Sequence, residues 1–325
     1  MSASQALEIP FPIMRYDITM PLFEGRVEIS GVRLKPVRLS SMIFKEEAAL
    51  KHGDFGVGEL NLGYFLPAIE AGWELVGLPV FVKRKPVYQF VFCRADAGIA
   101  TPQDLEGKRI GTRAYRTAIT VWLRGLLQQY HGVDLTKLRW VVWSGEVFPI
   151  YDEGAQIEPP ADRSKDPVDS LLDGEIDALI TDISDAQLFA RLENSPQVKR
   201  LFPNYIDEDY RLYRQTGIYT PVHLITLSRK LDARYPDLAR RLFEAFEKAK
   251  QLAYEDILSD RAGFSVVYLR ERMKEQLERW GDPWRYGITA NRHTIDTFIA
   301  YNVDQGMIRA APAYAQIFAQ SVLDT

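Results

Sequence analysis

Short apolar runs alternate along the chain with segments in which apolar residues recur at helical spacing. One such pair is the apolar run Lys108–Thr112 and the segment Thr117–Tyr130, whose leucines stand three and four residues apart on one helix face. Regular alternation of strand-like and helix-like segments is typical of proteins built from βαβ units. The pattern therefore predicts an α/β fold.

The apolar runs and turn residues give approximate positions for the elements. Strands are expected at Ile13–Ile18, Val27–Val37, Phe55–Leu60, Leu75–Val80, Tyr88–Arg94, Lys108–Thr112, Leu138–Trp143, Asp177–Thr181, Val198–Phe202 and Val222–Leu227. Helices are expected at Met42–Leu50, Asn61–Ala71, Thr117–Tyr130, Asp166–Leu172, Ser184–Leu192, Pro236–Tyr254, Leu269–Trp280 and Thr294–Gln305. The segment 144–165 is polar and contains three prolines, which indicates a surface loop.

The order of these elements predicts two α/β lobes, the second inserted into the first. The first lobe comprises residues 1–93 and 220–325, and the second comprises residues 94–219. The strands Tyr88–Arg94 and Val222–Leu227 would be the two hinge crossings between them. Ligands of such folds commonly bind where strand ends and helix N-termini converge, so a cleft between the lobes is expected. This wiring resembles the type 2 periplasmic-binding-protein fold.

Composition narrows the functional classes. The 325 residues carry a net charge of −4 and no basic block, which argues against a nucleic-acid partner. The single cysteine, Cys93, excludes an internal disulfide. No run reaches the ~18 apolar residues of a membrane span, and the N-terminus lacks the pattern of a secretory signal. We therefore expect a cytoplasmic protein without a membrane partner, and the sequence leaves open whether it forms a homo-oligomer.

Motifs for metals and cofactors are missing from the sequence. It contains no GxxxxGK[ST], HExxH or GxSxG motif, and the glycines of the segment 56–63 do not have the dinucleotide-binding spacing. The acidic clusters 182–185 and 207–209 lack the spacing of metal-binding loops. Solvated surface is the simpler interpretation of such clusters. We expect a protein that uses neither a metal nor a cofactor.

Two titratable residues are candidates for proton transfer. His223 begins an expected hinge strand that faces the cleft, and histidine is the usual proton-transfer group near neutral pH. The alternative is a core histidine that bonds a backbone carbonyl. Glu59 ends an expected strand and Asn61 begins the next helix, so Glu59 either points into the cleft as a general acid or caps the helix.

A second group of residues is a candidate anion site. Arg113 and Arg116 precede the expected helix that opens at Thr117. The N-terminus of a helix offers free N–H groups and a positive dipole, and arginines add charge-assisted hydrogen bonds. The alternative is that these arginines are solvated. Tyr115 and Trp143 could supply stacking walls for an aromatic ligand, or they could belong to the core.

Several sequence blocks between Phe11 and Phe318 match one known family. They are RYDITMPLFEGRV, FGVGELNLGYF, LPVFVKR, DLEGKRIGTRAY, TAITVWLRGLLQQYHGV, DGEIDALIT, TGIYTPVHLITL and YGITANRHTIDTFIAYNVDQGM. The combination of TAxxVWxRGLL, TGIxxPxH and the YGI…N…QG tail is the most specific part. On these blocks the chain resembles the 4,5-dihydroxyphthalate decarboxylase family, which shares the periplasmic-binding-protein fold.

The resemblance implies a small anionic aromatic substrate and non-oxidative loss of CO2 without a cofactor. In that reaction a ring hydroxyl supplies electrons and a general acid protonates the ring carbon. The residues that match the family are Glu59, Arg84, Thr117, Arg124 and His223. The resemblance implies His223 or Glu59 as the proton donor and Arg84 as a carboxylate anchor, while Arg124, inside an expected helix, is open to a purely structural role.

One segment departs from the family pattern. After Arg84 the family carries a Phe-Arg-His-like stretch, whereas this chain has Lys85-Pro86-Val87-Tyr88. Arg113 and Arg116 could replace the missing cation. The departure leaves a second interpretation, in which the protein is a solute-binding protein that captures a small anion without catalysis. The fold suits both activities equally.

Overall fold

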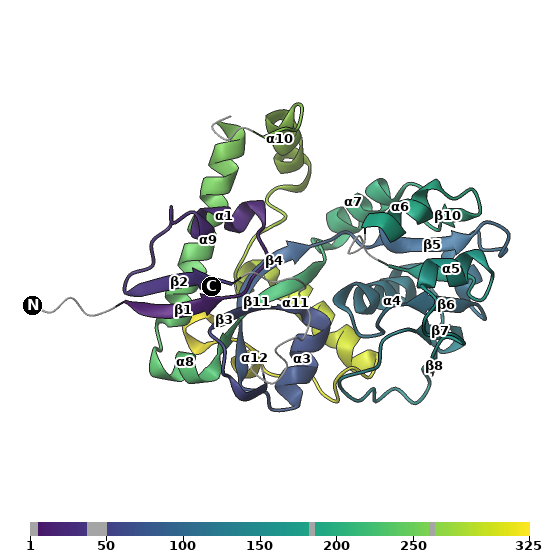
Figure 1. Cartoon of the computed structure of the whole chain (residues 1–325), viewed down its shortest axis with the longest axis horizontal. Coiled ribbons are helices and arrows are strands. Elements are labelled where there is room, and N and C mark those ends of the chain that lie inside the picture. Colours follow the sequence, from purple (N-terminus) through teal and green to yellow (C-terminus); the bar gives the residue numbers. More distant parts are fainter. Residues whose placement is uncertain (1–5, 38–50, 182–185, 260–263) are drawn as a thin grey trace, which may run out of the picture. The chain divides into compact units, whose positions relative to one another are not determined.

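The computed structural model describes residues 6–37, 51–181, 186–259 and 264–325 (Figure 1). The chain divides into two compact units, and the chain crosses between them more often than the sequence predicts. Unit 1 comprises Met1–Arg84, Pro221–Ile295 and Pro312–Thr325. Unit 2 comprises Lys85–Thr220 and Asp296–Ala311.

Unit 1 is built around a three-stranded antiparallel sheet with β11 in its centre. The order is β3 (Val57–Asn61), β11 (Pro221–Ser228) and β4 (Leu75–Arg84). Every residue of β11 is buried, as expected for a central strand covered on both faces. A separate pair of parallel strands, β1 (Leu7–Phe11) and β2 (Val32–Pro36), completes the strands described in this unit.

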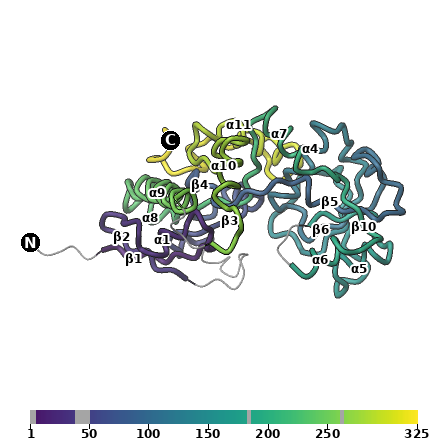
Figure 2. The backbone as a smooth tube through the Cα atoms, turned by 90° about the horizontal axis from the view of Figure 1, so that it is seen from above, coloured from purple at the N-terminus to yellow at the C-terminus, as the bar shows by residue number. Residues whose placement is uncertain are grey.

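Helices pack on these strands of unit 1. The longest, α9 (Leu238–Leu258), lies beside β1 and β2 in both views, and its Phe246 ring stands 6.0 Å from that of Phe11 (Figures 1 and 2). The other helical elements are η1 (Asp17–Thr19), α1 (Met20–Phe23), α3 (Leu62–Glu70), α8 (Arg229–Arg234), α10 (Leu269–Trp280), the start of α11 (Ile288–Asp304), α12 (Tyr314–Ile317) and η5 (Gln320–Val322).

Unit 2 contains a mixed six-stranded sheet in the order β10-β5-β9-β6-β7-β8. The strands are β5 (Val91–Arg94), β6 (Arg109–Thr112), β7 (Arg139–Val142), β8 (Gln156–Glu158), β9 (Ala178–Ile180) and β10 (Val198–Arg200). The helical elements are η2 (Tyr88–Phe90), η3 (Pro102–Leu105), α4 (Ala118–His131), η4 (Leu135–Lys137), α5 (Pro167–Leu172), α6 (Ala186–Asn194) and α7 (Tyr205–Thr216). β6 runs parallel to both β7 and β9, as βαβ units require.

The unit boundary inside α11 has a structural cause. The second half of α11 packs on α4, where the Trp122 ring lies 5.0 Å from Phe298 and 5.7 Å from Tyr301. These contacts place residues 296–311 in unit 2, whereas the sequence assigned them to the first lobe. Residues 85–93 also belong to unit 2, so the two expected crossings fall at 84/85 and 220/221, and two further crossings fall at 295/296 and 311/312.

Most expected elements occur within a few residues of their predicted bounds, but some differ. The expected strand Ile13–Ile18 is wrong, because this segment is irregular and then forms η1, while the strand lies earlier at Leu7–Phe11. Helix α7 was not predicted, because its sequence is strongly polar. The expected helix Met42–Leu50 lies outside the described residues. Within the described part of the chain, no helix is long and apolar enough to cross a membrane.

Candidate functional site

The register of the unit 1 sheet brings Glu59 and His223 to the same face. In the β11–β3 pair, His223 is opposite Asn61 and Ile225 is opposite Glu59. Side chains alternate between the two faces along a strand, and directly paired residues share a face. Glu59 is therefore the diagonal neighbour of His223, a position that long polar side chains can bridge.

The two side chains are in direct contact. His223 Nδ1 lies 2.5 Å from Glu59 Oε1. The Glu59 side chain is 0% exposed and that of His223 is 9% exposed, so little water competes with the interaction. Electrostatic interactions are stronger in such a desolvated setting than at the surface. The structure thus joins the two residues that the sequence proposed as proton donors.

Glu59 accepts further hydrogen bonds from the segment before η1. The Met14 backbone N–H donates to Glu59 Oε2 at 3.0 Å, and the Tyr16 hydroxyl donates to Glu59 Oε1 at 2.6 Å. Burial and the neighbouring Glu59 charge both raise the pKa of Tyr16, which keeps its hydroxyl protonated as a donor. Both oxygens of Glu59 therefore accept a hydrogen bond from this segment. Since a carboxylate oxygen accepts, His223 Nδ1 is the donor in its contact with Glu59 Oε1.

The other predicted site residues of unit 1 have structural bonds. Asn61 is the N-cap of α3 and accepts a hydrogen bond from the Gly63 N–H at 3.0 Å. Arg84 donates to the Arg285 carbonyl at 2.9 Å and to Asn291 Oδ1 at 2.6 Å, and it is 6% exposed. These bonds tie the end of β4 to the start of α11. These hydrogen bonds give Arg84 a structural role, which the resemblance did not imply.

A cation that the sequence did not suggest stands close to the pair in the sheet. Lys83 on β4 is the register partner of His223 on the side away from β3. The β4–β11 pairing is irregular on both sides of this position. Strand irregularities often re-aim side chains at functional sites. Lys83 lies in the block LPVFVKR, which was noted only for Arg84.

In unit 2, Arg116 is built into the protein rather than presented on its surface. Its side chain is 0% exposed and forms an ion pair with Glu146 through Nε. Its Nη2 donates to the carbonyls of Phe148 at 2.6 Å and Pro149 at 3.1 Å. The guanidinium therefore holds the loop after β7 against the start of α4, a structural role that the sequence did not predict.

The remaining candidates of unit 2 lie around the same helix start. Thr117 is the N-cap of α4, its hydroxyl accepting from the Thr120 N–H, and Arg113 is exposed. Tyr115 is a core residue, 3% exposed, and the Trp143 indole N–H donates to the Lys165 carbonyl at 2.7 Å. Tyr115 is thus buried in the core, whereas Trp143 is half-buried and its indole N–H is bonded within unit 2.

Arg124, the last residue implied by the family resemblance, lies wholly inside unit 2. It is 0% exposed and donates to Gln305 Oε1 at 2.8 Å and to the Tyr115 carbonyl at 2.7 Å. Its guanidinium stacks 3.7 Å from the centre of the Tyr115 ring, and burial lowers its pKa. These contacts describe a structural role for Arg124, the role that its position inside an expected helix left open.

Comparison with known proteins places the chain in a family. The model of one family, described as NMT1/THI5 like, matches residues 44–256, which is more than half of the chain. The chain belongs to the NMT1/THI5-like family. Both Glu59 and His223 fall inside the matched range, whereas Tyr16 precedes it.

Two curated relatives of this NMT1/THI5-like chain carry the same name. A 4,5-dihydroxyphthalate decarboxylase from Comamonas testosteroni is 29% identical, and the alignment covers 98% of this chain and 98% of the relative. A 4,5-dihydroxyphthalate decarboxylase from Pseudomonas putida is 29% identical over 54% of this chain and 70% of the relative. The resemblance drawn from the sequence blocks is confirmed.

Solved structures confirm the fold of the NMT1/THI5-like chain. The periplasmic aliphatic sulphonate binding protein SsuA from Escherichia coli matches with a TM-score of 0.57 and 15% identity, covering 98% of this chain and 93% of the other. The desulfurization enzyme DSZB matches with a TM-score of 0.52 and 15% identity, covering 98% of both chains. The chain has the α/β fold of periplasmic solute-binding proteins, as predicted. At these identities the likeness shows the fold alone.

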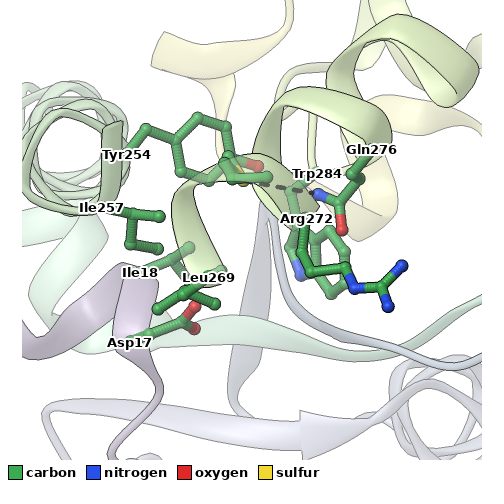
Figure 3. Close-up of a pocket in the computed structure, with 9 residues that line it drawn as sticks. Asp17, Ile18, Tyr254, Ile257, Leu269, Arg272, Gln276 and Trp284 are labelled. Carbon is green, nitrogen blue, oxygen red and sulfur yellow. Dashed lines mark hydrogen bonds between the residues drawn. The ribbon is translucent and has the colours of Figure 1, made fainter. Parts of the chain in front are cut away.

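A separate cavity of about 180 Å³ lies in unit 1 next to the segment that carries Tyr16. Figure 3 shows it between η1, α9 and α10, with Tyr254 and Trp284 among its walls. It is lined by Asp17, Ile18, Tyr254, Ile257, Leu269, Arg272, Met273, Gln276 and Trp284. None of these residues belongs to the Glu59–His223 pair. The described residues also hold no group of three or more His, Cys, Asp or Glu side chains arranged to bind a metal.

Substitutions in unit 2 separate stability from anion binding. Arg116→Ala should lower the free energy of unfolding by about 2–4 kcal/mol, because Glu146 and two carbonyls lose a buried donor. Arg113→Ala should leave stability unchanged and weaken binding of an aromatic carboxylate by ~1.5–3 kcal/mol, the value of a charge-assisted hydrogen bond. Thermal unfolding and calorimetric titration measure the two effects. Unchanged affinity in both variants would refute the anion site.

Proposed function

We propose that the protein is a decarboxylase that removes one carboxylate, as CO2, from a hydroxylated aromatic acid of the 4,5-dihydroxyphthalate class. The observation that carries this proposal is the buried contact between Glu59 and His223 at 2.5 Å. Two relatives at 29% identity carry the matching name, one across almost the whole chain. Together they favour a carboxy-lyase over a protein that only binds.

The proposed reaction is a protonation of the ring followed by loss of CO2. A hydroxyl on the ring donates electron density to the carbon that bears the leaving carboxylate. His223 Nε2 gives its proton to that carbon, forming the new C–H bond. The C–C bond to the carboxylate then breaks, and its electron pair returns to the ring as CO2 departs. Atoms and electrons balance without an oxidant or reductant.

Glu59 and Lys83 have complementary parts in this scheme. Glu59 keeps the imidazole oriented through Nδ1 and stabilises the imidazolium form, since an opposite charge in contact favours it. Lys83, the register partner of His223, offers a cation to a substrate carboxylate. This assignment makes His223 the proton donor and Glu59 its partner, which narrows the choice that the sequence left open.

A solute-binding protein for a small anion is the second candidate function. The altered stretch Lys85–Tyr88 favours it, and the fold that the chain shares with a periplasmic sulphonate binding protein is compatible with it. Such a protein would bind its ligand without changing it.

The location and the oligomeric state of the protein stay predictions. A cytoplasmic location accompanies the decarboxylase proposal, and the sequence leaves a homo-oligomeric state open.

Incubation with a panel of hydroxylated aromatic mono- and dicarboxylic acids distinguishes the two functions. CO2 release and calorimetric binding are followed on the same samples. We expect CO2 release from at least one acid with a hydroxyl para to a carboxylate, and we expect it to survive exhaustive chelation, because ring protonation needs no Lewis acid. Binding without turnover would support the solute-binding function. Loss of activity on chelation, restored by one divalent metal, would contradict the cofactor-free reaction.

A further inference from the structure

Tyr16 and His223 share one oxygen atom of Glu59. The Tyr16 hydroxyl donates to Glu59 Oε1 at 2.6 Å, and His223 Nδ1 lies 2.5 Å from the same atom. The second oxygen, Oε2, accepts from the Met14 N–H at 3.0 Å. The negative charge on Oε1 is thus divided between an imidazole and a phenol.

This sharing has a consequence for the acid. A hydrogen bond to a carboxylate oxygen stabilises the charged form and lowers its affinity for a proton. A stronger hydrogen bond from the Tyr16 hydroxyl to Oε1 therefore weakens the hydrogen bond that the same oxygen accepts from His223 Nδ1. A weaker interaction between Glu59 and the His223 imidazolium makes the imidazolium a stronger acid. A stronger acid transfers its proton more readily to a poorly basic ring carbon.

We propose that Tyr16 is a positioning residue of the Glu59–His223 pair, which orients the carboxylate and weakens its hold on the imidazole proton. The proposal deepens the proposed function and rests on it for its catalytic meaning. Tyr16 is not itself expected to touch the substrate. Its effect reaches the reacting atoms through Glu59 and His223.

The backbone of Tyr16 is held in place independently of its hydroxyl. The Tyr16 N–H donates to Thr19 Oγ1 at 3.0 Å, and this hydroxyl donates back to the Tyr16 carbonyl at 3.1 Å. Thr19 is 0% exposed, so these bonds are shielded from water. Removing only the phenol oxygen should therefore leave the segment in position, and a Tyr16→Phe variant should report on the hydrogen bond alone.

The test compares the titration of His223 in the parent protein and in Tyr16→Phe by NMR. The chain has four histidines, and the signal lost in His223→Gln identifies the one required. Glu59 on β3 is in contact with His223, and the register partners of His223 are Lys83 on β4 and Asn61 on β3, of which Glu59 and Lys83 can carry a charge. We expect the midpoint to rise by about 0.5–1 pH unit in Tyr16→Phe, because Glu59 then holds the imidazolium more firmly.

Tyr254→Phe is the matched control. Tyr254 also donates to a carboxylate in unit 1, Asp282 Oδ1, at 2.9 Å, and it stands on α9 in the wall of the separate cavity (Figure 3). Its removal should not move the His223 titration. In a Glu59→Gln background, Tyr16→Phe should no longer shift the midpoint, because the charge that couples the two groups is gone.

Steady-state kinetics supply the catalytic readout. With the acid turned over by the parent protein, Tyr16→Phe should lower kcat by about 3–10-fold and change KM by less than about twofold. An unchanged or lowered midpoint in Tyr16→Phe would overturn the proposal, whether or not any acid is decarboxylated. A raised midpoint without turnover of any panel acid would leave the coupling standing and reject the decarboxylase function.

Discussion

Replacing His223 with glutamine is expected to lower turnover of the aromatic acid by ~10²–10⁴-fold, the usual contribution of a general acid. Glutamine cannot carry the transferable proton that an imidazolium carries at Nε2. Its amide can still donate a hydrogen bond to Glu59, which would otherwise be left as a buried carboxylate with one donor fewer. The substitution therefore removes the acid and keeps most of the local structure.

The pH profile of turnover in the parent protein should also reflect the protonation of His223. The imidazolium is the active form, so turnover is present below the titration of His223 and is lost as the pH rises through it. The His223→Gln variant should lose this limb of the profile. Its remaining activity should no longer follow the titration of a histidine.

A matched substitution controls for the loss of an imidazole. His293 is exposed on α11, and His293→Gln should leave turnover unchanged. Circular dichroism and thermal unfolding of each variant separate chemistry from folding. Near-normal turnover in a folded His223→Gln protein would contradict the assignment of His223 as the donor. Failure of that variant to fold would instead support a core histidine with a structural role.

The pairing of Glu59 with His223 shows what the sequence could predict. Each residue was identified from its own position, Glu59 before a helix start and His223 on an apolar strand. Their contact depends on the antiparallel register of β3 with β11, which joins segments 164 residues apart. Local pattern does not encode that register. Tyr16 was missed for a related reason, since its segment was expected to form a strand rather than to bond Glu59.

Arg116 shows what the sequence could not predict. Arg116 precedes a helix N-terminus, which made it a candidate for binding an anion. Its actual partner, Glu146, and the two carbonyls that it bonds all come from a segment predicted only as surface loop. A buried ion pair of this kind depends on the three-dimensional course of the loop. Residue type and spacing therefore located the cation correctly but not what it binds.

The blocks TAxxVWxRGLL and YGI…N…QG were recognised as specific, and the structure explains why they belong together. Val121, Arg124 and Gly125 of α4 face the second half of α11 and Gln305, the residue directly after it. The Val121 carbonyl accepts from Gln305 Nε2 at 3.0 Å, and Arg124 Nε donates to Gln305 Oε1 at 2.8 Å. The spacing on α4 is that of one helix face. The two blocks thus form one helix–helix contact inside unit 2.

Replacing glycine with alanine inside a helix usually increases stability. Gly125→Ala is expected instead to lower the free energy of unfolding by about 2–4 kcal/mol, because the added methyl group overpacks the contact. A Cβ at this position would lie inside the Tyr301 ring, against three of its carbon atoms. The ring would have to move, losing its hydrogen bond to Gln129 and its edge contact with Trp122 at 5.7 Å. Such a change should lower Tm by roughly 5–15 °C.

Gly145→Ala is the control for this substitution, because a Cβ there meets nothing within 4 Å and Gly145 is not among the glycines with a positive φ. It should leave Tm unchanged. Adding Tyr301→Ala to Gly125→Ala should make the combined loss smaller than the sum of the two single losses, since the clash is gone. Hydrogen exchange should show residues 296–311 becoming less protected in Gly125→Ala. An unchanged Tm, or additive losses in the double variant, would contradict the close approach of α4 and α11 at Gly125.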